Sequence, residues 1–156
     1  MSVQSSTIQD QTSASAARAA RGGTFDDDSL LIDFFDRLGT ALSSGDASAV
    51  ADSWQAPALV VGQEGIVHAV SSRAEVEAFF AAAREQYTAR GISSTRAEIV
   101  RVNWVSPRTA FAELRWPMLD AKQREVGEER ATYTLQTNDD GELKIRVAVS
   151  HAEPTH

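Results

Sequence analysis

Residues 109–119 have the sequence TAFAELRWPML, and this stretch decides the fold. Every second side chain from Ala110 to Met118 is apolar, whereas Glu113 and Arg115 lie between them. A period of two is typical of a β-strand that packs one face on a core and turns the other toward polar surroundings. We therefore expect a half-buried strand here, and the same alternation continues along the rest of the chain.

Three turn signals divide the chain from residue 92 onward into four antiparallel strands. They lie at residues 106–107, 120–123 and 138–141. A two-residue loop at 121–122 would place Trp116 opposite Gly127. Because each turn fixes a register, the side chains can be assigned to two faces. The opposite face is polar, places Arg101 across from Glu113, and is expected to be solvated or to contact a second subunit. The apolar members of this opposite face are Ile99 and Phe111. The face expected to pack on the helices carries Val100, Val102, Trp104, Ala110, Ala112, Leu114, Trp116, Met118, Ala131, Tyr133, Leu135, Leu143, Ile145, Val147 and Val149.

Two ionisable side chains interrupt this apolar face. A three-residue loop at 139–141 would place Leu135 opposite Ile145 and, farther along the same two strands, Glu129 opposite His151. A carboxylate and an imidazole cannot stay unpaired in a dry core. We therefore expect that they bond to each other or line a wet cavity between sheet and helices.

The first part of the chain predicts two helices separated by Gly45. The first begins at Ser29 and ends near residue 44, and Asp46 is the expected N-cap of a short second helix that runs to about Trp54, before Pro57. The apolar stripe of the first helix has helical spacing. It consists of Leu31, Phe34, Phe35, Leu38, Ala41 and Leu42.

A short hairpin and a third helix follow. Residues 58–61 and 66–70 are expected to pair across a turn at 62–65. Ser72 and Glu75 have the spacing of a capping box, which predicts a helix that ends at Gly91. Its buried face is expected to carry Val76, Phe79, Phe80, Ala83 and Tyr87.

The order of these elements resembles the NTF2-like superfamily, in particular its SnoaL-like branch. The resemblance is carried by residues 41–54 (ALSSGDASAVADSW), by residues 72–80 (SRAEVEAFF) and by the four-strand meander, and it covers about residues 28–152. It implies an α+β fold in which three N-terminal helices pack on a strongly curved antiparallel sheet, a cone-shaped barrel of the cystatin-like type with a pocket at its mouth. It also implies that a homodimer is common.

Composition limits the class of protein. We expect one domain at residues 25–153, a disordered tail at 1–24 and a short tail at 154–156. The net charge of −7 disfavours nucleic-acid binding, and no apolar stretch is long enough to predict a membrane span or a signal peptide, so the cytoplasm is the expected location. Without cysteine, and without histidines at metal-ligand spacing, we expect no metal and no cofactor.

The functional hypothesis is a pocket for a small apolar ligand. Glu129 and His151 are the candidate catalytic pair for proton transfer, of the kind that isomerases, cyclases and dehydratases of the resembled superfamily perform without cofactors. The alternative is a structural pair in a non-catalytic ligand-binding or dimerisation module. The candidate ligand-binding residues are Trp54, His68, Leu114, Trp116 and Tyr133, and Trp104 is a further candidate for an aromatic wall.

Overall fold

The computed structural model describes residues 26–152, and the predicted tails at 1–24 and 154–156 lie outside this range. The chain divides into two compact units, Met1–Phe34 and Phe35–His156. The described part of the first unit is the beginning of helix α1 (Asp26–Ser44). The second unit contains the rest of α1, two more helices and the whole described sheet.

Local hydrogen bonds define the end of α1 and the start of α2 (Ala47–Ala51). Gly45 has a φ of 75°, and the amides of Gly45 and Asp46 donate to carbonyls in the last turn of α1, which is a Schellman ending. The Asp46 carboxylate accepts from the Ala49 amide at 3.0 Å and caps α2. The predicted helix end and N-cap are both confirmed.

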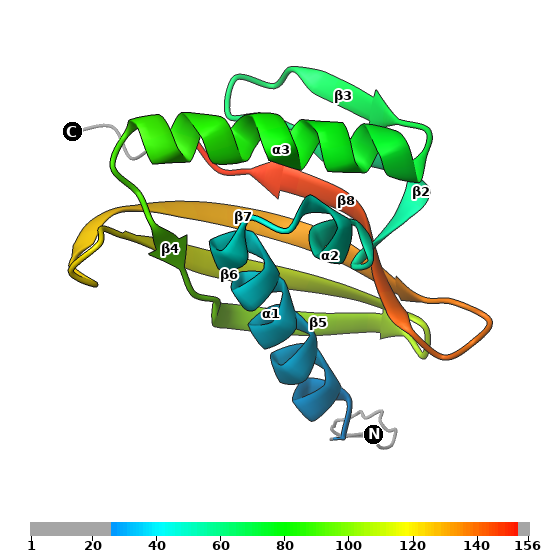
Figure 1. Ribbon diagram of the computed structural model, residues 1–156. Coiled ribbons are helices and arrows are strands. Elements are labelled where there is room, and N and C mark those ends of the chain that lie inside the picture. Colours follow the sequence, from blue (N-terminus) through cyan, green and yellow to red (C-terminus); the bar gives the residue numbers. More distant parts are fainter. Residues whose placement is uncertain (1–25, 153–156) are drawn as a thin grey trace. The chain divides into compact units, whose positions relative to one another are not determined.

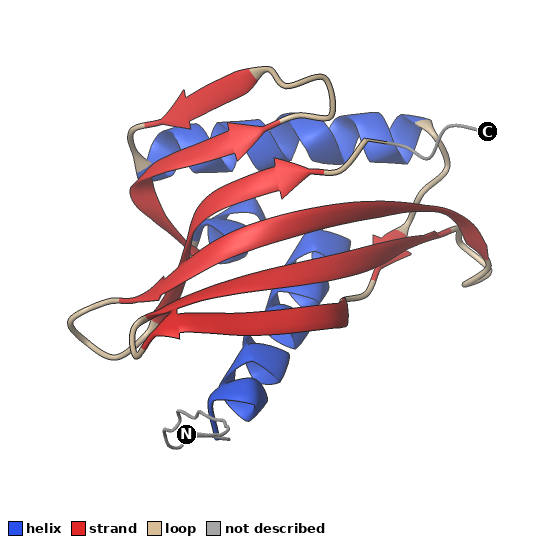
Figure 2. Ribbon diagram, turned by 180° about the vertical axis from the view of Figure 1, so that it is seen from behind, coloured by secondary structure: helices blue, strands red, loops and turns tan. Residues whose placement is uncertain are grey.

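Helix α3 (Arg73–Ala89) begins and ends where the sequence predicts. The Ser72 hydroxyl accepts from the Glu75 amide, and the Glu75 carboxylate accepts from the Ser71 amide. Gly91, with a φ of 79°, lies just beyond the helix. Figures 1 and 2 show α3 running across the face of β2 and β8. No helix within residues 26–152 combines the length and the apolar character that a membrane crossing requires.

A curled, unclosed sheet of seven strands forms the rest of the described chain (Figure 2). The strand order is β3-β2-β8-β7-β6-β4, and β5 also pairs with β6. All pairs are antiparallel except β2 with β8, which is parallel and was not expected. The strands are β2 (Trp54–Val61), β3 (Val67–Val70), β4 (Ser94–Thr95), β5 (Glu98–Ser106), β6 (Thr109–Leu119), β7 (Glu125–Thr137) and β8 (Leu143–Ser150).

The prediction for Trp54 and Pro57 is wrong in one respect. Trp54 does not end the second helix but begins strand β2, and Pro57 lies inside that strand after a cis peptide bond. The pairing of β2 with β8 is irregular between Trp54 and Leu59, so the missing amide hydrogen of proline interrupts no regular ladder. The predicted hairpin of β2 and β3 is confirmed.

The turn between β7 and β8 has the predicted form, but a bulge follows it. Gly141 has a φ of 83°, and Leu135 pairs with Ile145 as expected. Thr134 then pairs with Val147, which leaves Arg146 as an extra residue on β8. Because one extra residue reverses the alternation, all side chains of β8 beyond Arg146 lie on the face opposite to the predicted one.

This bulge overturns the predicted pairing of Glu129 with His151. The His151 amide donates to the Arg130 carbonyl, and the His151 ring lies 2.7 Å from the Thr132 hydroxyl. Thr132 alternates with Ala131, so His151 lies on the outer face whereas Glu129 lies on the inner face. For the same reason, Val147 and Val149 lie on the outer face and not on the predicted inner face.

The turn between β6 and β7 is longer than predicted but keeps the predicted faces. Gln123, with a φ of 64°, closes a wider loop, and a further irregularity follows at Leu119. Trp116 therefore pairs with Glu129 and not with Gly127. The displacement is two residues, and an even displacement leaves every side chain on its face.

Ion pairs cover the outer face of the sheet. Arg101 pairs with Glu113 at 2.8 Å, as the predicted register requires. Arg115 donates to Glu98 and Glu128 and also contacts Glu125. An irregularity in β5 turns Val100 outward and places Ile99 across from Leu114, which reverses the prediction for these two residues.

The ion pairs of the outer face predict that the free energy of unfolding falls at acidic pH. Hydrogen bonds from Arg130 and Arg115 hold the pKa of the Glu128 carboxyl below its ordinary 4.5. A lowered pKa in the folded state stabilises the fold above pH 4.5, and this contribution is lost as the pH falls further. We expect Glu128→Gln to reduce the loss of unfolding free energy between neutral pH and about pH 3, measured by urea denaturation.

The matched control is Glu64→Gln, which changes an exposed carboxylate in the turn between β2 and β3. It should keep the acid response of the wild type. An equal acid response in the Glu128→Gln protein and the wild type would show that the ion pairs of Glu128 contribute nothing to stability.

Candidate functional site

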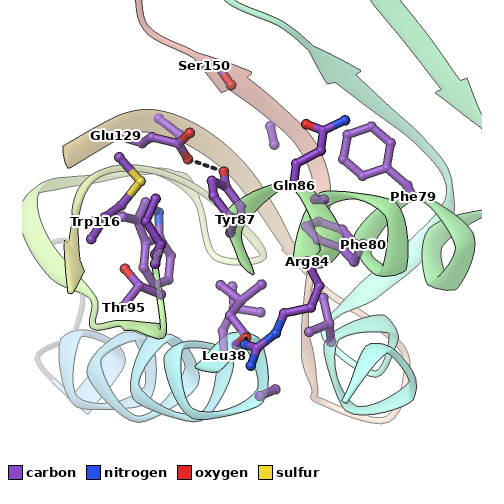
Figure 3. Close-up of a pocket in the computed structure, with 18 of the residues that line it drawn as sticks. Leu38, Phe79, Phe80, Arg84, Gln86, Tyr87, Thr95, Trp116, Glu129 and Ser150 are labelled. Atoms are coloured by element: carbon purple, nitrogen blue, oxygen red, sulfur yellow. Dashed lines mark hydrogen bonds between the residues drawn. The ribbon is translucent and has the colours of Figure 1, made fainter. Parts of the chain in front are cut away.

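A cavity of about 340 Å³ lies between the inner face of the sheet and the helices of the second unit. Its walls are mostly apolar and come from the end of α1, from α2 and α3, and from strands β2, β4, β6, β7 and β8. Figure 3 shows Trp116 and Thr95 along one side and Phe79, Phe80 and Gln86 of α3 along another. This cavity is the candidate site.

Glu129 supplies a carboxylate to this cavity. Its place on the inner face follows from the alternation along β7, in which Ala131, Tyr133 and Leu135 share the same phase and are buried. The Tyr87 hydroxyl donates a hydrogen bond of 2.7 Å to Glu129 Oε1, drawn as the dashed line in Figure 3. The carboxylate is thus fixed by a donor from α3, and its second oxygen can act on a bound molecule.

Tyr133 and Trp116 form a second polar pair in the same cavity. The Trp116 indole Nε1–H donates to the Tyr133 hydroxyl oxygen at 2.8 Å. The ring of Phe35 lies 5.4 Å from the Tyr133 ring and 6.4 Å from the Trp116 ring, so both side chains are held by packing. Since the hydroxyl oxygen accepts from Trp116, its own hydrogen can be donated to a ligand.

Both tyrosines of the site stay protonated far above neutral pH. Burial raises the pKa of Tyr87 well above its ordinary 10, and the adjacent Glu129 charge and hydrogen bond raise it further. Burial likewise raises the pKa of Tyr133, against the opposing effect of the hydrogen bond from Trp116. The two hydroxyls are therefore hydrogen-bond donors at any physiological pH.

Arg84 ties α3 to the end of α1. Its guanidinium donates to the carbonyls of Leu42 and Ser43 at 3.1 and 2.8 Å, which satisfies acceptors that the helix end leaves open. The glycine at position 45 leaves room for this contact, because a Cβ there would lie 3.2 Å from Arg84 Nε. Figure 3 shows Arg84 near Leu38 and away from Glu129, so the cavity carries opposite charges in separate places.

The structure brings together four of the predicted site residues. Glu129, Trp54, Trp116 and Tyr133 all line the cavity. Their roles remain predictions, and the sequence did not indicate that Tyr87 would be the partner of Glu129. The predicted buried face of the third helix, which includes Tyr87, was the one signal that could have found it.

Four other candidates lie apart from the cavity lining. Leu114 is fully buried on β6, and Trp104 lies on β5. His68 is exposed on β3, with its ring 6.1 Å from that of Phe79. His151 lies on the outer face, as described above. Within residues 26–152, no group of three or more acidic or histidine side chains is arranged to hold a metal ion.

The chain belongs to the family described as NTF2-like protein (DUF6841), which it matches over residues 27–153. This membership agrees with the order of helices and strands and with the curled sheet. Among curated proteins, none matches the chain.

Several solved structures share the fold. A domain of unknown function with a cystatin-like fold from Nostoc punctiforme is 20% identical, with a TM-score of 0.69 over 85% of this chain and 81% of that one. An NTF2-like protein with a cystatin-like fold from Novosphingobium aromaticivorans is 16% identical, with a TM-score of 0.66 over 90% and 89%. An NTF2-like protein of unknown function from Shewanella oneidensis is 15% identical, with a TM-score of 0.63 over 80% and 98%.

The tyrosine environment can be tested directly, because the sequence contains only two tyrosines and both line the cavity. We expect neither to ionise near pH 10 in the folded protein, whereas both should do so in denaturant. Because the pKa is raised in the folded state, the protonated tyrosines contribute to the free energy of unfolding. This contribution is complete below pH 10 and is lost as the pH rises further. Ultraviolet absorbance of tyrosinate during an alkaline titration measures both states.

The variant Tyr133→Phe isolates Tyr87 in this titration. Adding Glu129→Gln to it should move the Tyr87 transition to lower pH, since the neighbouring negative charge is removed. A tyrosine that titrates normally in the folded wild type would contradict the described cavity.

Proposed function

We propose that this chain is a small-molecule-binding NTF2-like protein of the SnoaL-like kind that catalyses proton transfer without a cofactor. The observation that carries the proposal is the Glu129 carboxylate, which lines an apolar cavity and accepts a hydrogen bond from Tyr87. A carboxylate oriented in such surroundings is suited to act as a general base.

The chemistry that fits these groups is enolisation of a carbonyl compound. Glu129 removes a proton from the carbon next to the carbonyl, the electron pair of that C–H bond forms a carbon–carbon double bond, and the π pair of the carbonyl moves onto its oxygen. The Tyr133 hydroxyl, polarised by the bond it accepts from Trp116, donates to the developing oxyanion. Glu129 then returns the proton to the same carbon or to another, so the step is balanced within the substrate and the enzyme.

Tyr87 is a positioning residue in this scheme. Its hydroxyl contacts the carboxylate and comes from α3, so it determines where Oε1 lies. His151, the partner predicted from the sequence, has no part in the scheme because it lies on the other face of the sheet.

Exchange of carbon-bound hydrogen with solvent tests the proposal without knowledge of the natural substrate. Deoxybenzoin is mostly apolar and has an acidic methylene group beside a carbonyl. We expect the wild type to accelerate exchange of these hydrogens in deuterium oxide, followed by proton NMR. Glu129→Gln should reduce the acceleration about a hundredfold or more, the usual range for loss of a general base.

The matched control is Glu128→Gln, which removes the neighbouring carboxylate on the outer face of the same strand. It should exchange deoxybenzoin as fast as the wild type. If Glu129→Gln retains the wild-type rate, or if the wild type gives no acceleration, Glu129 is not a base for carbonyl substrates.

A second candidate function, association of two copies of the chain, has its own supporting observation. The outer face exposes Phe111 (41%) and Val149 (36%) among the ion pairs of Arg101 and Arg115. Apolar side chains with a charged surround are common at interfaces between subunits. On this proposal the protein is a homodimer that uses the outer sheet face, whether or not the cavity is catalytic.

Sedimentation velocity tests this second candidate. We expect the wild type to sediment as a dimer and Phe111→Glu to sediment as a monomer, because a carboxylate would be buried without a partner. Val67→Glu, at an exposed valine of β3, is the control and should remain dimeric. A monomeric wild type at high micromolar concentration would exclude the proposed interface.

A further inference from the structure

Arg84 is a half-buried cation in the cavity lining, and no carboxylate of residues 26–152 pairs with it. Both of its hydrogen bonds start at Nη1, and they end at the carbonyls of Leu42 and Ser43. The end of a helix carries only about half of an elementary negative charge. A net positive charge therefore remains beside a mostly apolar cavity, where an anion would be stabilised by it.

The donors that Arg84 does not use form one edge of its guanidinium. Nε and Nη2 have no hydrogen-bond partner within the described chain. Their N–H groups lie side by side, which is the arrangement that binds both oxygens of a carboxylate. The polar atoms of residues 26–152 that are both buried and unpaired belong to other side chains, so Nε and Nη2 of Arg84 keep accessible surface.

The neighbouring backbone leaves this edge uncovered. Position 45 is a glycine, and a Cβ there would lie 3.2 Å from Nε and 3.4 Å from Cζ of Arg84. Gly45 lines the cavity together with Arg84. Figure 3 shows the Arg84 side chain reaching from α3 toward Leu38, away from Glu129. An anion at Arg84 would thus be separated from the carboxylate of Glu129.

We propose that the Nε edge of Arg84 is an anion subsite, and that the ligand of the cavity carries a carboxylate on an otherwise apolar body. The net charge of −7 repels anions from the protein as a whole, so a preference for a carboxylate has to come from a local cation. The inference rests on the small-molecule pocket of the proposed function but not on proton transfer.

The test uses three probes of similar size that differ in charge. At neutral pH phenylacetate is an anion, phenylacetamide is neutral and phenethylammonium is a cation. We expect calorimetry to show that the wild type binds phenylacetate about tenfold more tightly than phenylacetamide, within the range for a hydrogen bond to a charged group. Phenethylammonium should bind most weakly.

Arg84→Gln removes the positive charge and should reverse this order. Glu129 then dominates the charge of the cavity, so phenethylammonium should bind more tightly than phenylacetate. A displaced α3 alone would weaken all three probes together and would not reverse their order. Arg84→Lys keeps the charge without the paired N–H edge and should keep only part of the preference for phenylacetate. If circular dichroism shows that Arg84→Gln does not fold, Arg84→Lys decides.

The matched control is Arg130→Gln. It removes an arginine that pairs with Glu113 and Glu128 on the outer face of the sheet. This variant should bind the three probes in the same order as the wild type.

The outcomes separate this inference from the proposed catalysis. Glu129→Gln should bind phenylacetate more tightly than the wild type does, because a repelling charge is lost. A wild type that prefers phenylacetate but exchanges no hydrogen of deoxybenzoin supports the inference and refutes the proton transfer. A wild type that binds phenylacetamide as tightly as phenylacetate, or that binds no probe, overturns the inference. An unchanged order of affinities in folded Arg84→Gln overturns it as well.

Discussion

The alternation of side chains along β7 is the constraint on which the site depends. Ala131 and Leu135 are buried on its inner face, and Glu129 and Tyr133 have the same phase. A shift of the strand by one residue would bring Leu135 out of the core and put Thr132 and Thr134 in. The buried apolar neighbours therefore keep the carboxylate and the phenol inside the cavity. The same strand register that packs the core also determines the geometry of the site.

The inner faces of β6 and β7 could be predicted because nothing in the connection between them changes the phase. The loop closed by Gln123 displaced the pairing by two residues, and the faces survived. On β8 the single extra residue Arg146 reversed the phase and carried His151 outward. Arg146 is held by tertiary contacts, to the Pro57 carbonyl and to Gln136, and no glycine or proline within β8 marks the bulge.

The candidate site was predictable only as far as single strands determine it. Trp116, Glu129 and Tyr133 follow from alternation, and Trp54 is at the cavity although the sequence placed it at the end of the second helix and not at the start of strand β2. The bond between Tyr87 and Glu129 joins residues 42 positions apart on a helix and a strand. This hydrogen bond forms only because of where α3 lies on the sheet. Helical spacing predicts which face of a helix is buried, but it does not predict which atoms of the sheet that face will contact.

The packing of helix α3 supports the proposal that the cavity binds a ligand. Of its 17 residues only Val76 is fully buried, and Phe79 and Phe80 remain partly exposed where they line the cavity. A fold under selection for stability alone would fill such a space, because side chains that border a void lose dispersion contacts. Proteins retain defects of this kind mainly at functional sites. A molecule that filled the cavity would supply the missing dispersion contacts to α3 and to the inner face of the sheet.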